Sequence, residues 1–370
     1  MSFTEKSYIK NLLRSRPAQY RDQINKKEYL LVDRQEFGFN TAKASLKLNK
    51  YYEKLDLNHY PQIDKFYKFL SKFINVKLNK ILVTEGCTGG IKQIIEGYTI
   101  KGNNIIVAYP TFILYSVFAK LSNITLKKVE YNKELKLNAN SYLDKIDKKT
   151  SIIFLTNPGA PNDFVLPKKE IEKICIACKK KNIIVALDDA YYPYYNLNLI
   201  SLINKYNNFI VLRTFSKYYG LASLRVGYIV ASEKKIEYLS KFRGGYEINS
   251  PTIDITQDII KNKKFFLKKQ DDMEKAKVFA MKELKKNYIK VKSFGNANYL
   301  CVSVSQNENV AKIANYLFKK KIVVKYNLPA PFKDCILFTL TDIEDVKKIL
   351  KPLIYAYNQA NNWEIVQGIT

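Results

Sequence analysis

Histidine is almost absent from this chain, and its scarcity narrows the chemistry that the protein can perform. His59 is the single histidine among 370 residues. Zinc sites in proteins draw most of their nitrogen ligands from histidine. A histidine-rich metal site is therefore excluded.

Cysteine is also scarce, and its spacing argues against a disulfide framework. The five cysteines are an odd set with one closely spaced pair, Cys175 and Cys178. These two lie three residues apart in an amphipathic helical run, residues 171–180, so their side chains share one face. We expect this pair to pack in the core and not to bind metal or act in redox chemistry.

Long hydrophobic runs are missing as well. Apolar residues make up 47% of the chain but occur in short stretches such as 105–108 and 183–186. None approaches the roughly 18 residues that a bilayer span requires. The first residues also lack the apolar core and cleavage site of a secretory signal. We therefore expect a cytoplasmic protein, with one large domain and a smaller one because the chain exceeds an ordinary domain.

Arginine is rare although the chain is strongly basic, with a net charge of +28. The lysines are spread along the whole length, whereas nucleic-acid binding favours a clustered basic stripe. This dispersion indicates a solvated surface with some attraction for anionic substrates. It predicts at most weak, salt-dependent binding of nucleic acid. The seven arginines are Arg14, Arg16, Arg21, Arg34, Arg213, Arg225 and Arg243.

From about residue 80 onward, short β-branched runs alternate with helical stretches. Runs that are apolar on both faces and separated by helices indicate an α/β fold with a mainly parallel sheet covered by helices on both faces. Ligands collect at the carboxyl ends of such strands. We therefore expect functional residues directly after the runs, which are residues 81–84, 105–108, 152–156, 183–187, 210–213 and 226–230.

After about residue 245 the alternation loosens into an α+β pattern that suits a smaller domain. One Lys-rich helical stretch is predicted over residues 256–287, and a helix near 310–320 lies among shorter strands. The first 45 residues resemble an arm with one helix. The predicted division is residues 1–47, an N-terminal arm contributing to the small domain, residues 48–245, the large domain, and residues 246–370, the C-terminal small domain.

Two of the predicted strands lead into turns with a special composition. The turn over residues 84–91 is rich in glycine and contains Gly86, Cys87 and Thr88. Free backbone N–H groups where such a turn enters a helix favour a phosphate, although many strand-to-helix turns use glycine for geometry alone. Asn157 opens a second, rigid turn that ends at residue 162.

Two further strand ends carry ionisable groups. Asp188 ends a strongly apolar strand, and a buried carboxylate there needs a cationic or N–H partner. Lys217 follows another apolar strand, with Ser216 beside it and Arg225 eight residues further on. A partly desolvated lysine in a cationic setting has a lowered pKa and can act as a Schiff-base nucleophile. Ser216 and Arg225 would then hold a phosphate.

Together these segments resemble the fold-type I pyridoxal-phosphate enzymes among the class I/II aminotransferases. The resemblance is to the histidinol-phosphate aminotransferase-like branch, which also includes threonine-phosphate decarboxylases. It covers roughly residues 30–345 and is strongest around the lysine. The residues that carry it are Tyr60, Gly86-Cys87-Thr88, Phe112, Asn157-Pro158, Asp188-x-Ala190-Tyr191 and Ser216-Lys217-x7-Arg225.

The resemblance implies a role for each of these residues in a large domain that binds pyridoxal 5′-phosphate. Lys217 would carry the cofactor as a Schiff base and move a proton, Asp188 would pair with the pyridinium nitrogen, and Tyr191 would bond the phenolic oxygen. Phe112 would stack on the ring, and Asn157 would also contact the cofactor. The residues implied around the cofactor phosphate are Gly86, Cys87, Thr88, Ser216, Arg225 and Tyr60, the last reaching over from a second subunit of a homodimer.

Two positions depart from the family pattern. Ala160 stands where the family loop Asn-Pro-x-Asn-Pro-Thr-Gly has its second asparagine, so one hydrogen bond to the cofactor is lost. Leu337 stands where the family has an arginine that grips the substrate carboxylate. Arg34 and Arg243 are the candidates to replace that arginine, and Glu247 stands where relatives commonly carry asparagine. We therefore expect a different substrate.

Three functions compete at this point. An aminotransferase acting on a small amino compound, with or without a phosphate group, ranks first. A pyridoxal-phosphate decarboxylase of a phosphorylated amino acid ranks second. In a decarboxylase the bond to be broken must stand perpendicular to the cofactor ring, and the loss of an arginine that grips the carboxylate suits this requirement. A basic nucleic-acid-binding protein with a degenerate enzyme fold ranks third, since it gives no reason for Lys217, Asp188 and Arg225 to coincide.

Overall fold

The computed structural model describes residues 24–25, 27–45, 58–304 and 309–367, with side chains to residue 360. The chain divides into two compact units. The first contains Thr41–Ala160 and Val165–Lys263, and the second contains Pro161–Phe164, Lys264–Thr370 and the described part of Arg14–Asn40. The helix expected in the N-terminal arm, with Arg14, Arg16 and Arg21, lies outside the described residues.

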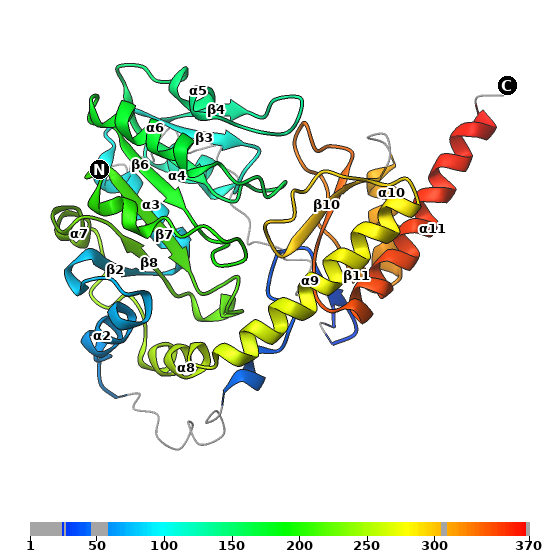
Figure 1. The fold of residues 1–370 in the computed structure, drawn as a ribbon, viewed down its shortest axis with the longest axis horizontal. Coiled ribbons are helices and arrows are strands. Elements are labelled where there is room, and N and C mark those ends of the chain that lie inside the picture. Colours follow the sequence, from blue (N-terminus) through cyan, green and yellow to red (C-terminus); the bar gives the residue numbers. More distant parts are fainter. Residues whose placement is uncertain (1–23, 26, 46–57, 305–308, 368–370) are drawn as a thin grey trace, which may run out of the picture. The chain divides into compact units, whose positions relative to one another are not determined.

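The first unit is built on a seven-stranded sheet (Figure 1). Strand β8 is antiparallel to both of its neighbours, and the remaining pairs are parallel. The mainly parallel sheet that the sequence predicts is therefore confirmed. The strand order is β2 (Ile81–Thr84), β8 (Gly227–Val230), β7 (Phe209–Thr214), β6 (Ile184–Asp188), β5 (Thr150–Thr156), β3 (Asn104–Tyr109) and β4 (Thr125–Glu130).

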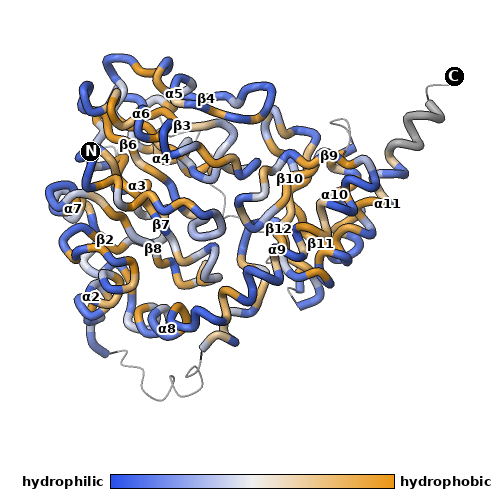
Figure 2. Tube along the Cα trace, viewed as in Figure 1, coloured by the Kyte–Doolittle hydropathy of each residue, from blue (hydrophilic) through white to orange (hydrophobic). Residues whose placement is uncertain are grey.

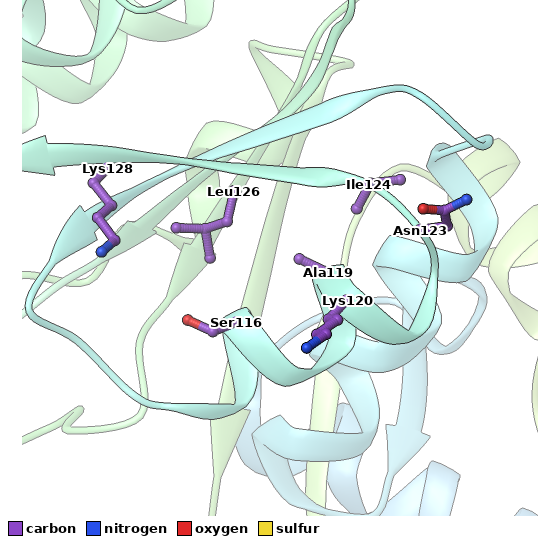
Figure 3. Close-up of a pocket in the computed structure, with 7 residues that line it drawn as sticks. All are labelled: Ser116, Ala119, Lys120, Asn123, Ile124, Leu126 and Lys128. Atoms are coloured by element: carbon purple, nitrogen blue, oxygen red, sulfur yellow. The ribbon is translucent and has the colours of Figure 1, made fainter. Parts of the chain in front are cut away.

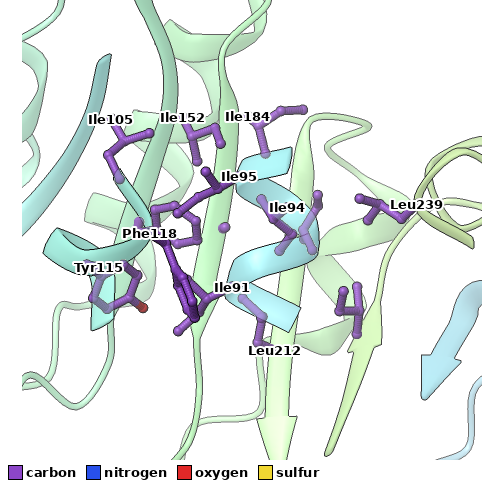
Figure 4. Close-up of a cluster of buried hydrophobic side chains, with 14 of the residues drawn as sticks. Ile91, Ile94, Ile95, Ile105, Tyr115, Phe118, Ile152, Ile184, Leu212 and Leu239 are labelled. Carbon is purple, nitrogen blue, oxygen red and sulfur yellow. The ribbon is translucent and has the colours of Figure 1, made fainter. Parts of the chain in front are cut away.

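One face of this sheet packs against an apolar layer from three helices. Figure 4 shows Ile91, Ile94 and Ile95 of one of these helices beside the strand residues Ile105 and Ile152, and all five are fully buried. Alternate strand residues are buried on the opposite face too, and α6 packs there against β6. Hydrophobic burial on both faces is why the strands read as continuous apolar runs (Figure 2). The helices of this unit are α2 (Ile63–Ile74), α3 (Gly86–Tyr98), α4 (Leu114–Leu121), α5 (Ala139–Leu143), α6 (Lys168–Lys179), α7 (Glu233–Ser240) and α8 (Ser250–Ile260).

The second unit contains a three-stranded sheet and a separate two-stranded sheet. In the larger sheet β10 (Tyr299–Ser303) lies between β9 (Lys290–Val291) and β12 (Cys335–Thr339), and both pairs are antiparallel. Strand β1 (Leu30–Leu31) pairs in parallel with β11 (Ile322–Val323). The helices are α9 (Lys263–Lys286), α10 (Val310–Lys319) and α11 (Ile343–Gln367).

Three features differ from the sequence-based expectations. The helical stretch expected over 256–287 is two helices, α8 and α9, which end and begin around Asn262. At this point the Asn262 backbone N–H donates to the Ile259 carbonyl, three residues back, at 3.1 Å, so the α-helical hydrogen-bond pattern is interrupted. Strand β4 was not expected, because it is an edge strand with charged residues and therefore has no continuous apolar run. The compact units also differ from the predicted division, since they separate at Lys263 and the first includes α8.

The two cysteines with close spacing lie where expected. Cys175 and Cys178 are buried on α6, and all five cysteines have free thiols. Among the described residues, no helix is long and apolar enough to cross a membrane.

Candidate active site

The Gly-rich turn forms the N-terminus of α3, where several polar groups meet. Gly86 has a left-handed φ of 70°, and no side chain caps the helix, so its first backbone N–H groups stay available. A Cβ on Gly86 would lie 3.0 Å from the Arg225 guanidinium. The Arg225 side chain also donates to the Glu85 carbonyl at 3.3 Å and is exposed. The arginine and the helix N-terminus thus make one cationic cup, suited to a phosphate.

Hydroxyl groups complete this cup. Ser216, directly before Lys217, is buried, and its backbone N–H donates to Thr214 Oγ1 at 3.1 Å. The Thr214 and Ser216 hydroxyl oxygens lie 2.9 Å apart. Thr214 was not among the predicted site residues, although its place at the end of β7 could have indicated it. The structure therefore brings Gly86, Ser216 and Arg225 together, as the family pattern implies.

Close backbone packing under the cup depends on Gly227, which pairs with Thr84 between β8 and β2. A Cβ at this position would lie 2.6 Å from Gly86 Cα and 2.7 Å from the Arg213 carbonyl oxygen. We expect Gly227→Ala to lower the free energy of unfolding by about 1–3 kcal/mol, the usual range for overpacking. Urea denaturation measures this loss. Gly244→Ala is the matched control, because no atom lies within 4 Å of its added Cβ, and equal stability of the two variants would contradict the packing account.

Asp188 lies at the carboxyl end of β6 and is almost fully buried. Its Oδ2 accepts a hydrogen bond from the Tyr115 hydroxyl at 2.7 Å, whereas its buried Oδ1 has no hydrogen-bond partner in the described part of the chain. Burial raises the pKa of Asp188, and the polar contacts with Tyr115 and Cys87 oppose this effect. An additional cation or N–H group at Oδ1 would therefore favour the ionised carboxylate.

Lys217 and Tyr191 lie close to this carboxylate. The Lys217 Nζ is 5.6 Å from the centroid of the Tyr191 ring, and its charge favours the ionised form of Asp188. Tyr191 is buried, and Lys217 is half-buried. The three residues that the sequence assigns to catalysis thus gather at one edge of the sheet.

A buried ion pair underlies this edge. Asp189 accepts from the Arg213 Nε at 2.7 Å and from the Tyr195 hydroxyl, and both charged side chains are at most 5% exposed. Burial raises the pKa of Asp189 to about 6, against the effect of Arg213. Losing one partner of such a pair leaves an uncompensated charge. We therefore infer that Asp189 stabilises the structure under the site and takes no direct part in the reaction.

The other predicted cofactor residues are Asn157, Phe112 and Tyr60. The Asn157 side chain is fully buried, and its Oδ1 accepts from the Leu166 backbone N–H at 2.6 Å, so this oxygen already holds the loop. Phe112 is 44% exposed. Tyr60 is 76% exposed, and its ring stacks on Tyr246 with centroids 4.5 Å apart.

The predicted substrate residues of the first unit form a pair with each other. Arg243 Nη1 lies 3.4 Å from Glu247 Oε1, and the same oxygen accepts from the Tyr67 hydroxyl at 3.3 Å. Glu247 is buried, while the Arg243 side chain is 46% exposed. Arg243 therefore neutralises a buried acid, which the sequence analysis did not foresee, and keeps an exposed guanidinium.

The other candidate positions lie in the second unit. The Arg34 Nε is 3.9 Å from Asp33 Oδ2. Leu337 is buried in β12 and exchanges two backbone hydrogen bonds with Lys325, at 2.9 and 2.8 Å. The position that lacks the family arginine thus has a lysine beside it, which the sequence spacing alone did not indicate.

A surface cavity of about 270 Å³ lies between α4 and β4 (Figure 3). It contains none of the predicted site residues. None of its lining residues belongs to the group around Asp188, and its two lysines are part of the dispersed basic surface. Its lining residues are Ser116, Ala119, Lys120, Asn123, Ile124, Leu126 and Lys128.

Comparison with known proteins decides the family. A sequence model described as aminotransferase class I and II matches residues 33–353. The chain belongs to this family. It is 32% identical over 264 residues to a histidinol-phosphate aminotransferase of Methanococcus aeolicus, covering 69% of this chain and 70% of that protein. A histidinol-phosphate aminotransferase of Methanocaldococcus jannaschii is 30% identical over 306 residues, or 78% and 79% of the two chains.

Solved structures agree with this class I and II aminotransferase in fold. The histidinol-phosphate aminotransferase of Sinorhizobium meliloti, in complex with pyridoxal-5′-phosphate, has a TM-score of 0.84 at 17% identity and covers 97% of this chain and 99% of its own. An aspartate aminotransferase of Thermotoga maritima has a TM-score of 0.77 at 19% identity, covering 92% and 94%. The predicted fold and the predicted class of enzyme, a pyridoxal-phosphate-dependent aminotransferase, are confirmed at the level of the family.

Proposed function

We propose that this protein transfers amino groups with pyridoxal phosphate attached to Lys217, and that its substrate is a small amino compound with or without a phosphate group. The observation that carries the proposal is the unpaired, buried Asp188 Oδ1 beside the Lys217 amine. The names of the relatives, which are histidinol-phosphate aminotransferases, support a phosphorylated substrate.

The residues present fit this cofactor. A buried carboxylate oxygen without a partner suits a protonated pyridine nitrogen, which supplies both a charge and an N–H donor. The cup of Arg225, Ser216 and the α3 N-terminus suits a phosphate dianion. When bound, pyridoxal phosphate supplies an electron sink that stabilises negative charge on the substrate.

The chain's own residues then divide the work. The Lys217 Nζ is the point of attachment and the base that moves the proton at the substrate Cα. Asp188 keeps a positive charge at the pyridine nitrogen, and the Tyr115 hydroxyl fixes the orientation of that carboxylate. Tyr191 lies next to Lys217 and would donate to the phenolic oxygen of the cofactor, and Phe112 would stack on its ring.

The candidates for substrate binding are Arg243, with its neighbour Glu247, in the first unit and Arg34 in the second unit. Arg243 has an exposed guanidinium but already one carboxylate neighbour, so an anionic substrate group shares it with Glu247. Arg34 has a comparable partner in Asp33. Either Arg243 or Arg34 would supply the guanidinium that is missing at Leu337.

The proposal also includes a homodimer in the cytoplasm, with Tyr60 reaching the cofactor of the partner subunit. The high exposure of Tyr60 and of Tyr246, to which it stacks, supports a partner at this surface. The five free thiols are consistent with a reducing compartment.

Incubation of the holoenzyme with amino donors tests the proposed reaction. An aminotransferase leaves the amino group on the cofactor and releases an oxo product, whereas a decarboxylase releases carbon dioxide. We expect the aminated cofactor with phosphorylated amino compounds. Carbon dioxide in its place would establish the decarboxylase alternative.

Arg243→Ala is expected to impair use of an anionic substrate while leaving the cofactor spectrum intact. Loss of a charge contact inside a site costs about 2–5 kcal/mol, so kcat/KM should fall by at least tenfold. Steady-state kinetics measure the effect. Lys241→Ala is the matched control, since it removes an exposed cation two residues away. Unchanged kinetics in Arg243→Ala and in Arg34→Ala would refute this anchor.

A further inference from the structure

The loop between β5 and α6 is fixed at its base to the strand end that carries Asp188. The Asn157 backbone N–H donates to the Asp188 carbonyl at 3.0 Å. The Asn157 carbonyl accepts from the Tyr195 hydroxyl at 3.0 Å, and its side chain accepts from Leu166 N–H. A shift at the base of this loop is therefore transmitted directly to Asp188.

The tip of the same loop belongs to the second unit and is held there by Asp163. Residues Pro161–Phe164 are part of that unit, although the chain on either side belongs to the first. The Asp163 carboxylate accepts hydrogen bonds from four consecutive backbone N–H groups. The donors are Phe294 (2.5 Å), Gly295 (3.2 Å), Asn296 (2.5 Å) and Ala297 (2.9 Å).

Further contacts strengthen this attachment. The Phe294 N–H also donates to the Asn162 carbonyl at 3.1 Å, and the Asn296 side chain donates to the Asp163 carbonyl at 3.1 Å. The Phe164 and Phe294 rings pack edge-to-face with centroids 5.4 Å apart. The loop tip and the segment 294–297 therefore form one rigid contact.

Burying the Asp163 carboxylate in this backbone conformation costs free energy, which argues that the contact is more than incidental packing. The side chain is fully buried and forms no ion pair in the described structure. Burial raises the pKa of Asp163 to about 6, against the effect of the four N–H groups. Its φ of 49° is in the left-handed region, which favours glycine. In the family loop Asn-Pro-x-Asn-Pro-Thr-Gly, this position is the glycine.

We propose that Asp163 is a positioning residue, which holds the tip of the loop to the segment 294–297 and thereby keeps Asn157 in place against Asp188. The inference rests on the proposed function of Asp188. It offers a reason for the loss of asparagine at Ala160, because a loop attached at both its base and its tip needs no further hydrogen bond to the cofactor to hold its shape.

Asp163→Gly is the decisive variant, because glycine tolerates the backbone conformation and removes only the carboxylate. Hydrogen exchange of the holoenzyme, followed by mass spectrometry, should become about tenfold faster both in 294–297 and in 157–166. The cofactor dissociation constant should rise by about tenfold, and kcat should fall more than KM changes. Asp163→Asn, which keeps one acceptor oxygen, should show smaller effects of the same kind.

The proposal would be overturned if exchange became faster only in 294–297 while cofactor affinity and kcat were unchanged. Asp163 would then stabilise only its own contact with that segment. If Asp163→Gly fails to fold, Asp163→Asn gives the same comparison. The exchange measurement on the apoprotein also separates the two hypotheses. If Asp163 holds residues 157–166 in place, exchange in that segment of the apoprotein becomes faster in the variant, even if the chain binds no pyridoxal phosphate.

Discussion

Lys217→Ala is expected to abolish covalent attachment of pyridoxal phosphate and to reduce amino transfer by roughly 10²–10⁴-fold, the range for loss of a catalytic proton-transfer group. The variant loses the amine at 5.6 Å from the Tyr191 ring centroid, while the phosphate cup around Arg225 stays intact. It should therefore still bind the cofactor non-covalently. Absorbance of the Schiff base and the single-turnover rate measure the two effects separately.

Lys235→Ala is the control for this prediction. Burial lowers the pKa of Lys235, and its Nζ lies 5.1 Å from the Tyr98 ring centroid, so it resembles a desolvated lysine without the neighbouring carboxylate. The Lys235 variant should keep the absorbance and the activity. If it lost them and Lys217→Ala did not, the site would be elsewhere.

Asp188→Asn should produce the second large effect. The amide has nearly the same shape but no charge, so it cannot keep a positive charge at the cofactor nitrogen. Loss of a paired charge in a buried site costs about 2–5 kcal/mol, which is at least a tenfold loss of rate. We expect the Schiff base to persist, because Lys217 is unchanged, while kcat for amino transfer falls. Stopped-flow measurement of the first half-reaction isolates this step.

Asp189→Asn distinguishes a residue that stabilises the fold from one that takes part in the reaction. It breaks the buried pair with Arg213 at 2.7 Å, so its main effect should be lower thermal stability, with a loss of about 3–5 kcal/mol. Asp188→Asn should change the melting temperature less, since Oδ1 has no partner to lose in the apoprotein. The reverse pattern, with Asp189 controlling rate and Asp188 controlling stability, would exchange the two assignments.

The sequence predicts the sheet and the polar strand ends well, for a physical reason. Strands that are buried on both faces leave continuous apolar runs, and the ends of parallel strands meet at one edge. Asp188 and Lys217 are far apart in the chain, and this rule alone places them together. Strand β4 is missed because an edge strand does not need an apolar run.

The pairing of individual side chains could not be predicted, because it depends on tertiary contacts. Tyr115 fixes Asp188 from α4, 73 residues away. Arg243 was expected to be available for a substrate, but the structure gives it Glu247 as a neighbour. The role of Asp163 cannot be predicted from the sequence, because its four N–H partners lie more than 130 residues further along the chain.

Borohydride reduction of the holoenzyme followed by peptide mapping tests the central claim most directly, because reduction makes the cofactor–lysine bond permanent. The account predicts the reduced cofactor on a single peptide, attached to Lys217 next to Ser216. Attachment to a different lysine, or no attachment after incubation with pyridoxal phosphate, would contradict the assignment of this site.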